Sequence, residues 1–328
     1  MTARRSGATC VRFDLLMKIA YLIDRDSLGG GMEYVRRQIA AHADDECRVF
    51  FSERGECTPR QMDDWRADEI VVNHLRALVQ LLGNPLKRPK GRVTFVVHGV
   101  HLRKYVWRMR EGGAAGRLPV EASCGAGALR WLRVLSSYWL RRGLEASLYH
   151  RCDRIVALTE SDKADVLKWY GGGLPVEVEP NTLEGWNAEQ ADSWPAGIEG
   201  PFKFLCIGRF DYQKGQDRWI REMGKQEKAK GKKRGGRTLF IGDGPTLEAC
   251  KTLAQELGVA DRCVFAGAIS DAERYLECAE IVMSPSRWEG MPYLMMKARA
   301  LGCRILATDC PGNRDVLADY DKWERLEL

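Results

Sequence analysis

The sequence lacks the long apolar run of about 18 residues that a membrane-spanning helix needs. Residues 1–16 carry arginines but no apolar core of the kind found in secretory signal peptides, so none is expected. None of the eleven cysteines are spaced C-x-x-C, and no Cys/His cluster has the spacing of a zinc site. We therefore expect buried, reduced thiols in a cytosolic protein, with no structural metal.

Two further absences restrict the function. Neither half has G-x-G-x-x-G followed by an acidic residue about 20 positions later, which disfavours a dinucleotide oxidoreductase. The formal net charge of +6 is modest, and no known nucleic-acid-binding module is present. Nucleic acid is therefore not an expected partner.

What is present is an alternation of strand-like apolar runs with amphipathic segments, over a length that favours two domains. This order predicts parallel βαβ units. Strands are expected near 17–23, 47–51, 69–72, 93–97, 154–158, 203–208, 237–241, 262–266, 280–284 and 304–308. Helices are expected near 31–43, 58–66, 75–82, 129–150, 161–170, 215–230, 245–257, 271–278 and 292–301. The Gly- and Ala-rich segment 111–128 is expected to be a mobile loop.

The Gly- and Pro-rich stretch 171–201 has the composition of a linker. It divides the chain into a first domain over residues 17–190 and a second over residues 191–328. Residues 1–16 are expected to be a disordered leader or a start-site extension.

The segment GRFDYQKGQD at 208–217 follows the buried strand FKFLCI. Gly208 permits a tight exit from the strand. Arg209 and Lys214 then place two cations at the carboxyl end of a parallel strand, where open α/β sheets bind ligands. Such cations suit a phosphate, although two solvated basic residues in a loop would look the same.

A second candidate lies in SPSRWEGMPYL at 284–294. Glu289 and Gly290 precede Pro292, which suits the first turn of a helix. The start of that helix would offer backbone N–H groups to an anion, and Glu289 could accept hydrogen bonds from a sugar hydroxyl. Alternatively, Glu289 simply caps the helix.

Three weaker features also follow strands. Gly242 and Gly244 form a turn in FIGDGP, as in many α/β proteins. Gly30 and Gly31 belong to the Gly-rich loop SLGGGMEYV, whose amides could approach a diphosphate. His98 in VVHGV could bind a sugar hydroxyl, although a lone histidine is more often structural.

Together these segments, with FAGAISDAE, ATDCPGNRDVL and ALTESDKADVLKWYG, resemble the family 4 glycosyltransferases (glycosyl transferases group 1) of the GT-B fold. The resemblance covers roughly residues 17–317, and the order and spacing of the segments make it specific. It implies two Rossmann-like domains whose parallel sheets face each other across a cleft. It also implies transfer of a sugar, with retention of configuration, from a nucleotide-sugar donor such as a UDP- or GDP-sugar.

The resemblance also implies roles for individual residues. Arg209 and Lys214 match the basic pair that grips the donor diphosphate. Glu289 matches the first acid of a Glu-x7-Glu motif that contacts the donor sugar. The remaining donor-binding positions are Gly208, Gly242, Gly244, the base-side loop Ala268–Ile269, the turn Gly290, Met291 and Pro292, and from the first domain Gly30, Gly31 and His98. With two cations and a helix end at the phosphates, no metal and no other cofactor is expected.

The chain departs from the family at two places. The second acid of the motif, which usually binds ribose, is Lys297 here, and a lysine cannot accept those hydrogen bonds. Lys297 could turn outward or contact a phosphate. The chain also stops at Leu328, earlier than is typical of the family, so the second domain is expected to be short.

Residues 87–154 hold fifteen Lys and Arg but four Asp and Glu. Within them, the helix 129–142 places Arg130, Arg133, Ser137 and Arg141 on one face and Leu132, Leu135, Trp139 and Leu140 broadly on the other. Such a helix could lie on an anionic membrane or be an ordinary core-facing helix with a solvated basic face. The first alternative fits a cytoplasmic enzyme, peripheral on the inner face of the membrane.

The expected acceptor is a saccharide or a lipid-linked saccharide in polysaccharide or lipopolysaccharide synthesis. Two other functions stay open at this point. One is a catalytically impaired nucleotide-sugar-binding protein, which Lys297 suggests, and the other is a different GT-B enzyme such as a sugar phosphorylase.

Overall fold

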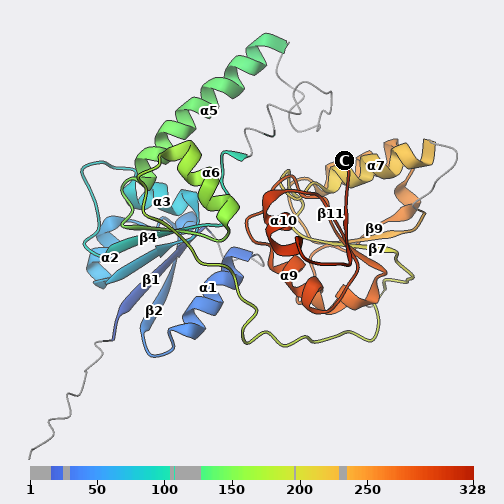
Figure 1. Cartoon of the computed structure of the whole chain (residues 1–328), viewed down its shortest axis with the longest axis horizontal. Helices are drawn as coiled ribbons and strands as arrows, with labels where there is room; N and C mark the ends of the chain where they lie inside the picture. Colours follow the sequence, from blue (N-terminus) through green and yellow to red (C-terminus); the bar gives the residue numbers. More distant parts are fainter. Residues whose placement is uncertain (1–15, 25–29, 104–106, 108–126, 196, 229–234) are drawn as a thin grey trace, which may run out of the picture.

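The computed structural model describes residues 16–24, 30–103, 107, 127–195, 197–228 and 235–328. For Gly30, residues 127–137 and Lys228, only the backbone is described. Two α/β bodies lie side by side, the first half of the chain on the left of Figure 1 and the second half on the right.

The first domain is built on a six-stranded parallel sheet with the order β2-β1-β3-β4-β5-β6. Its strands are β1 (Lys18–Ile23), β2 (Glu46–Phe51), β3 (Glu69–Val72), β4 (Arg92–Val97), β5 (Arg154–Ala157) and β6 (Val176–Val178). Its helices are α1 (Gly30–Ala41), α2 (Pro59–Trp65), α3 (Leu75–Leu82), α5 (Gly127–Tyr149) and α6 (Glu160–Tyr170), with the 3-10 turn η1 (Ser52–Arg54).

The second domain repeats this plan with the order β12-β11-β10-β7-β8-β9, again all parallel. Its strands are β7 (Phe204–Ile207), β8 (Thr238–Ile241), β9 (Cys263–Phe265), β10 (Ile281–Ser284), β11 (Ile305–Ala307) and β12 (Trp323–Arg325). Its helices are α7 (Gln216–Lys228), α8 (Leu247–Glu256), α9 (Tyr293–Ala300) and α10 (Pro311–Leu317), with the 3-10 segments η3 (Ala260–Arg262) and η4 (Ala272–Cys278).

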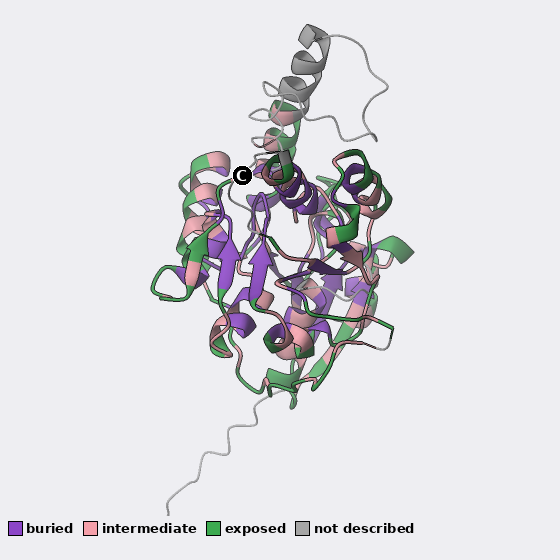
Figure 2. Cartoon of the chain, turned by 90° about the vertical axis from the view of Figure 1, so that its right-hand side faces the viewer, coloured by how far each residue is buried: buried purple, intermediate pink, exposed green. Residues whose placement is uncertain are grey.

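Each sheet is buried on both faces, as parallel sheets require. In β1, Ala20 and Leu22 belong to one apolar cluster and Ile19 and Tyr21 to another, because successive side chains point to opposite faces. Figure 2 shows the buried strands enclosed by helices whose outer surfaces are exposed. All nine described cysteines are free thiols, and six of them are buried.

The predicted α/β class with two parallel sheets is confirmed, and the predicted boundary at residue 190 lies between β6 and β7. The sequence interpretation missed β6, β12 and α10, which are short elements of three to seven residues with little room for a periodic pattern. The segment predicted as a helix at 271–278 is a 3-10 helix. Residues 1–15 of the expected leader 1–16 and residues 111–126 of the expected loop 111–128 lie outside the described residues. Gly127 and Ala128, predicted as the end of that loop, are the first residues of α5.

The two domains contact each other along one seam. Helix α6 lies against α10, where Ser161 Oγ donates to Asp315 Oδ1 at 2.9 Å. Asn181 Nδ2 donates to the carbonyl oxygen of Met291 at 2.8 Å. Tyr293 of α9 is buried in the apolar cluster that also contains Tyr34 of α1. The turn into α9 and helix α10 of the second domain are thereby held against the first domain.

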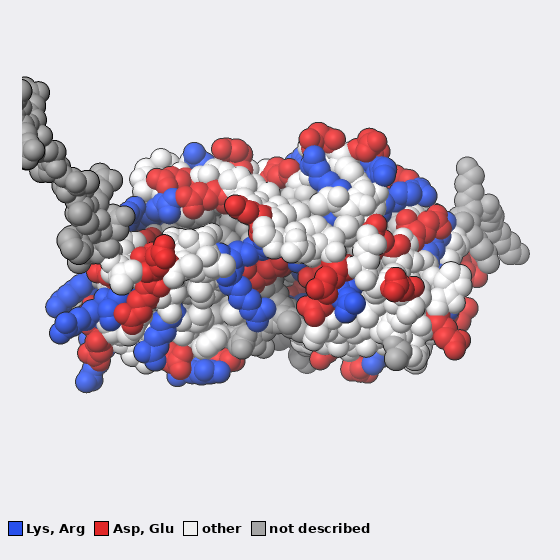
Figure 3. All heavy atoms as spheres, turned by 90° about the horizontal axis from the view of Figure 1, so that it is seen from below, with Lys and Arg blue, Asp and Glu red and all other residues white. Residues whose placement is uncertain are grey.

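Two properties of the surface bear on function. In the described part of the chain, no helix is both long enough and apolar enough to cross a membrane. On the face seen in Figure 3, acidic and basic side chains are interspersed over both domains. That pattern is typical of an ordinary solvated surface.

The loop before α9 is fixed by a buried ion pair, which gives a test of the fold. Arg287, only 4% exposed, donates from Nη1 and Nη2 to Asp217 at 2.8 and 2.9 Å. We expect Asp217→Asn to lower the free energy of unfolding by about 3 kcal/mol, because it replaces the carboxylate that pairs with a buried guanidinium by a neutral amide with one acceptor oxygen. Urea denaturation measures this change.

The matched control is Glu280→Gln, which breaks the half-exposed Arg304–Glu280 pair and should change stability by about 0.5 kcal/mol or less. Equal losses of stability in the two variants would show that the buried Arg287–Asp217 pair contributes no more to stability than the half-exposed Arg304–Glu280 pair.

Candidate functional site

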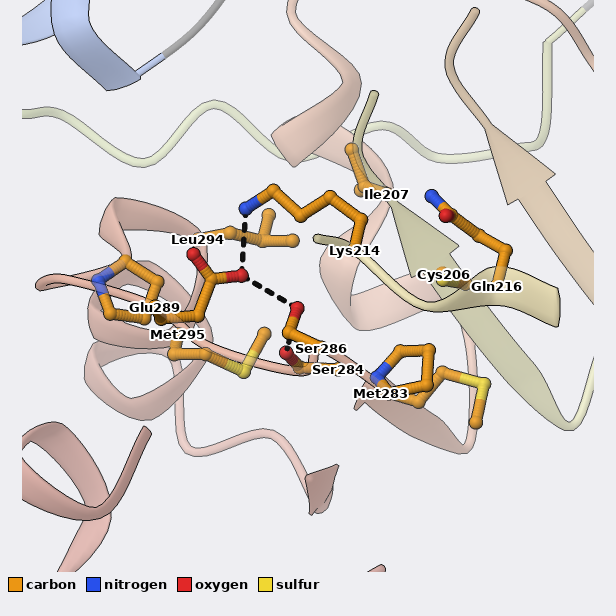
Figure 4. A pocket seen from close by; sticks show the side chains of 12 residues that line it. Cys206, Ile207, Lys214, Gln216, Met283, Ser284, Ser286, Glu289, Leu294 and Met295 are labelled. Carbon is orange, nitrogen blue, oxygen red and sulfur yellow. Dashed lines mark hydrogen bonds and ion pairs between the residues drawn. The ribbon is translucent and has the colours of Figure 1, made fainter. Parts of the chain in front are cut away.

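A small pocket lies at the carboxyl ends of β7 and β10 and is shown in Figure 4. Its lining comes from these strands, the loop before α7 and the start of α9: Cys206, Ile207, Lys214, Gln216, Met283, Ser284, Pro285, Ser286, Glu289, Pro292, Leu294 and Met295. The side chains of Lys214 and Glu289 point toward each other across the pocket. The position agrees with the general rule that open parallel sheets bind ligands at the carboxyl ends of their strands.

Glu289 is the best-connected group of this pocket. It is 5% exposed and accepts at Oε1 from Lys214 Nζ at 2.8 Å and from Ser286 Oγ at 2.6 Å. Gln213 Nε2 lies 3.4 Å from the other carboxylate oxygen. A buried carboxylate needs such donors to offset the loss of its hydration.

Lys214 is the partly accessible member of the pair, with 31% of its side chain exposed. Burial disfavours its charge, but the Glu289 carboxylate and Asp211 outweigh that effect and raise the pKa of Lys214 above its ordinary value. Lys214 is therefore a fixed cation at the mouth of the site.

Arg209 lies next to this pair but does not join it. Its side chain is 60% exposed, and its Nε donates to Asp211 Oδ2 at 2.6 Å. The other oxygen of Asp211 accepts from the backbone amide of Lys214 at 2.9 Å, so Asp211 orders the whole loop. The predicted basic pair is thus present on one loop, with Arg209 directed by Asp211 and Lys214 by Glu289.

The glycines of the second domain allow two loops to touch. A Cβ atom on Gly242 would lie 2.1 Å from the carbonyl oxygen of Gly208, and one on Gly244 would lie 2.4 Å from that of Phe210. Both glycines also have a positive φ. Close packing between the loops explains why residues 242 and 244 are glycines. Contact of Gly208, Gly242 and Gly244 with the donor stays a prediction.

The turn before α9 differs in detail from what we predicted. Pro292 is the N-cap residue and the helix begins at Tyr293, so Pro292 does not lie in the first turn. Glu289 makes no capping hydrogen bond to this helix, which removes the simple capping alternative. The Met291 carbonyl and sulfur contact Asn181 of the first-domain side, so these groups are engaged in the seam.

The remaining predicted residues of the second domain, Ala268 and Ile269, follow β9. Ala268 is exposed and Ile269 packs on an apolar cluster of the domain. The amide of Gly242 donates to the carbonyl of Gly267 at 2.7 Å, which joins this loop to the one after β8. The loop therefore lies at the same edge of the sheet as the pocket.

The first domain contributes His98 and the start of α1. His98 follows β4, its Nε2 lies 3.1 Å from Asn73 Oδ1, and Tyr34 packs edge-on against its ring. Burial, with a smaller effect of His74, lowers the pKa of His98 to about 4, so the ring is neutral at pH 7. Gly30 begins α1, and Gly31 packs near Ile23 at the end of β1.

Lys297 does not turn outward, which corrects one of the two expectations for it. Its side chain is 6% exposed, and its Nζ lies 2.8 Å from Glu33 of α1 and 3.0 Å from Glu273 of η4. Burial disfavours the charge of Glu273, but its own backbone amide and Lys297 hold the pKa of Glu273 below its ordinary value. Lys297 is thus a buried cation between two carboxylates, one from each domain.

Three residues around Glu289 were missed by sequence reasoning. Ser286 stands three positions before Glu289 and Gln213 stands beside Lys214, so both could have been found by their spacing. Arg103 donates from Nη1 to the Glu289 carbonyl oxygen at 3.0 Å, across the domain seam, and no local pattern marks it. Among the described residues, no group of three His, Cys, Asp or Glu side chains is placed to hold a metal ion.

Two parallel sheets with this pocket at the strand ends define a two-domain α/β protein of the GT-B type. Residues 201–323 match the family model described as glycosyl transferases group 1. The resemblance to this family is therefore confirmed, and the family match lies in the second domain.

An uncharacterized glycosyltransferase of Haemophilus influenzae is 30% identical over 168 residues, which covers 51% of this chain and 45% of that protein. The match thus spans under half the length of that relative. Among solved structures, the glycosyltransferase WaaG, involved in lipopolysaccharide biosynthesis, has a TM-score of 0.64 at 16% identity, covering 94% of this chain and 85% of that one.

A second similar structure is HepE of Anabaena, solved in complex with UDP and glucose. It has a TM-score of 0.60 at 15% identity and covers 90% of this chain and 82% of that chain. At such identities these likenesses show the fold, and the activity is argued below.

The buried position of Lys297 gives a second test. We expect Lys297→Glu, which would restore the second acid of the family motif, to lower the free energy of unfolding by about 3 kcal/mol or more. The new carboxylate would face Glu33 and Glu273 with no cation between them. Thermal melting at low salt measures the change, and Lys297→Met separates loss of the cation from the added repulsion.

A melting temperature of Lys297→Glu equal to or above that of the native protein would show that neutralisation of Glu33 and Glu273 by Lys297 does not stabilise the fold. The stability loss should also shrink in the triple variant Lys297→Glu, Glu33→Gln, Glu273→Gln.

Proposed function

We propose that the chain is a retaining glycosyltransferase that moves a sugar from a nucleotide-sugar donor to a saccharide or lipid-linked acceptor. The observation that carries the proposal is the buried Lys214–Glu289 pair at the carboxyl ends of β7 and β10, with Arg209 on the same loop. A diphosphate needs cations and a sugar hydroxyl needs an acceptor, and this arrangement supplies both in one pocket.

The proposed chemistry follows from these charges. Arg209 and Lys214 would stabilise the negative charge that grows on the leaving diphosphate, and preorganised charges of this kind are most effective in a partly buried site. Glu289 would accept hydrogen bonds from the donor sugar and orient it. The acceptor hydroxyl would attack on the face that the diphosphate leaves, and the leaving phosphate would take its proton, so no separate base and no metal is required.

The donor is proposed to be a UDP- or GDP-sugar. HepE, of similar fold, was solved with UDP and glucose, which supports UDP as the first nucleotide to test. The acceptor is proposed to belong to cell-envelope polysaccharide or lipopolysaccharide synthesis, which the similarity to WaaG supports.

A second candidate function has one specific observation in its favour. Lys297 is buried between Glu33 and Glu273 and cannot act as the second acid of the motif. A protein that binds a nucleotide sugar without turning it over would tolerate that change.

Nucleotide binding tests the proposal directly. We expect UDP-glucose or GDP-mannose to raise the melting temperature, since a ligand that binds only the folded state stabilises it. Arg209→Ala should abolish the shift, and it should lower kcat/KM by about 100- to 1000-fold, as loss of a group that stabilises developing charge does.

The control is Arg304→Ala, which removes a half-exposed arginine from the far part of the same domain. It should keep the shift and the turnover. A shift without turnover would favour the binding protein, whereas the absence of any shift with either nucleotide sugar would contradict both candidates.

Association with an anionic membrane is a separate part of the proposal. At the described end of α5, Trp139, Leu140 and Leu144 are 60, 76 and 46% exposed, beside Arg141 and Arg142. Apolar side chains flanked by arginines suit the headgroup region of anionic lipids. The two helix faces predicted from the sequence also include five residues whose side chains the structure does not describe: Arg130, Leu132, Arg133, Leu135 and Ser137.

We expect the protein to cosediment with phosphatidylglycerol vesicles at low salt, and the double variant Trp139→Ser, Leu140→Ser to cosediment less. Leu86→Ser is the matched control, because Leu86 is 92% exposed and does not belong to α5. Equal binding by all three proteins would exclude α5 as the contact surface.

A further inference from the structure

The first domain contacts the loop that carries Glu289, although Glu289 and Lys214, its ion-pair partner, both belong to the second domain. Arg103 follows β4, and its guanidinium is buried at the seam. Its Nη1 donates to the main-chain carbonyl of Glu289 at 3.0 Å. This hydrogen bond crosses from one domain to the other and ends on the residue at the centre of the pocket.

The orientation of Arg103 is set by two carboxylates in the first two turns of α6. Nε donates to Asp165 Oδ2 at 2.8 Å, and Nη1 donates to Asp162 Oδ1 at 2.6 Å. The Asp162 amide is itself held by Thr159, the N-cap residue of α6. Since a guanidinium is planar and its donors are fixed in direction, the two carboxylates fix the plane of Arg103, and Nη1 donates both to Asp162 and to the Glu289 carbonyl oxygen.

Three glycines bring the backbones together at the same place. A Cβ atom on Gly290 would lie 2.8 Å from the amide nitrogen of Gly99, and one on Gly312 would lie 2.0 Å from the carbonyl oxygen of Gly290. Gly99 also has φ +97°, a conformation that favours glycine. The Glu289–Gly290 peptide is therefore enclosed between the first domain and α10, with no space for a side chain.

We propose that Arg103 is a positioning residue, which sets the Glu289 carboxylate against Lys214 only when the two domains are closed. The role of Arg103 in catalysis rests on the proposed function, whereas the hydrogen bond between Arg103 and Glu289 does not depend on that function. Opening the domains would break the Arg103 hydrogen bond and the Gly99 contact together. The Glu289 loop would then lose its support from the first domain, while Arg209 would keep its contact with Asp211 within the second domain.

Variants of Arg103 are expected to fold. Burial raises the pKa of Asp162 to about 7, against the opposing effect of Arg103, and its Oδ2 has no hydrogen-bond partner within the described structure. Without Arg103 this carboxyl can take up a proton and stay neutral in its buried position.

The first measurement is hydrogen exchange of the segment 286–296 in the nucleotide-free protein. Arg103→Gln should speed exchange there. Arg151→Gln is the matched control, because Arg151 donates to the carbonyls of Asn84 and Lys87, both of the first domain. Gly99→Ala should speed exchange in the same segment without removing a charge.

The second measurement separates positioning from binding. With UDP-glucose or GDP-mannose as probe, Arg103→Gln should keep the thermal shift and lower kcat by about 10- to 100-fold, because a misplacement of about 1 Å at a reacting group has effects of this order. Arg103→Lys should restore part of kcat, since it keeps the cation but loses the fork.

Unchanged exchange in both Arg103→Gln and Gly99→Ala would overturn the inference, as would an unchanged kcat in Arg103→Gln. If neither nucleotide sugar binds the native protein, the proposed function fails, and the exchange measurement still decides whether Arg103 holds the loop.

Discussion

The burial of the Glu289 carboxylate is the constraint on which the rest of the site depends. A charged group that is 5% exposed is stable only if donors surround it. Lys214 and Ser286 meet that requirement from within the second domain, and Arg103 fixes the main chain of the same residue from the first. Contacts of Glu289 thus connect the loop after β7, the loop after β10 and the first domain.

The seam itself combines two kinds of interaction that act at different ranges. The contacts of Gly99, Gly290 and Gly312 are short-range and fail as soon as the backbones separate. The ion pair between Lys297 and Glu33 acts over a longer distance and is strengthened by burial. Together these contacts favour one arrangement of the two domains.

Lys297 shows how one substitution can be absorbed by its surroundings. At the position where the family motif has an acid, this chain has a cation, and two carboxylates from α1 and η4 neutralise it. Through this pairing, Lys297 links the second domain to α1 of the first domain.

Much of this protein could be predicted from the sequence by itself. The alternation of apolar runs and amphipathic segments determined the parallel α/β class, and GRFDYQKG and SPSRWEGMP located Arg209, Lys214 and Glu289 at strand ends, because these signals are local. The partners of those residues were decided only by the tertiary structure. Arg103 lies 186 positions from Glu289, and Lys297 lies far from Glu33 in the chain. Burial, charge pairing and close backbone packing depend on which distant segments come into contact, and a single sequence does not show those contacts.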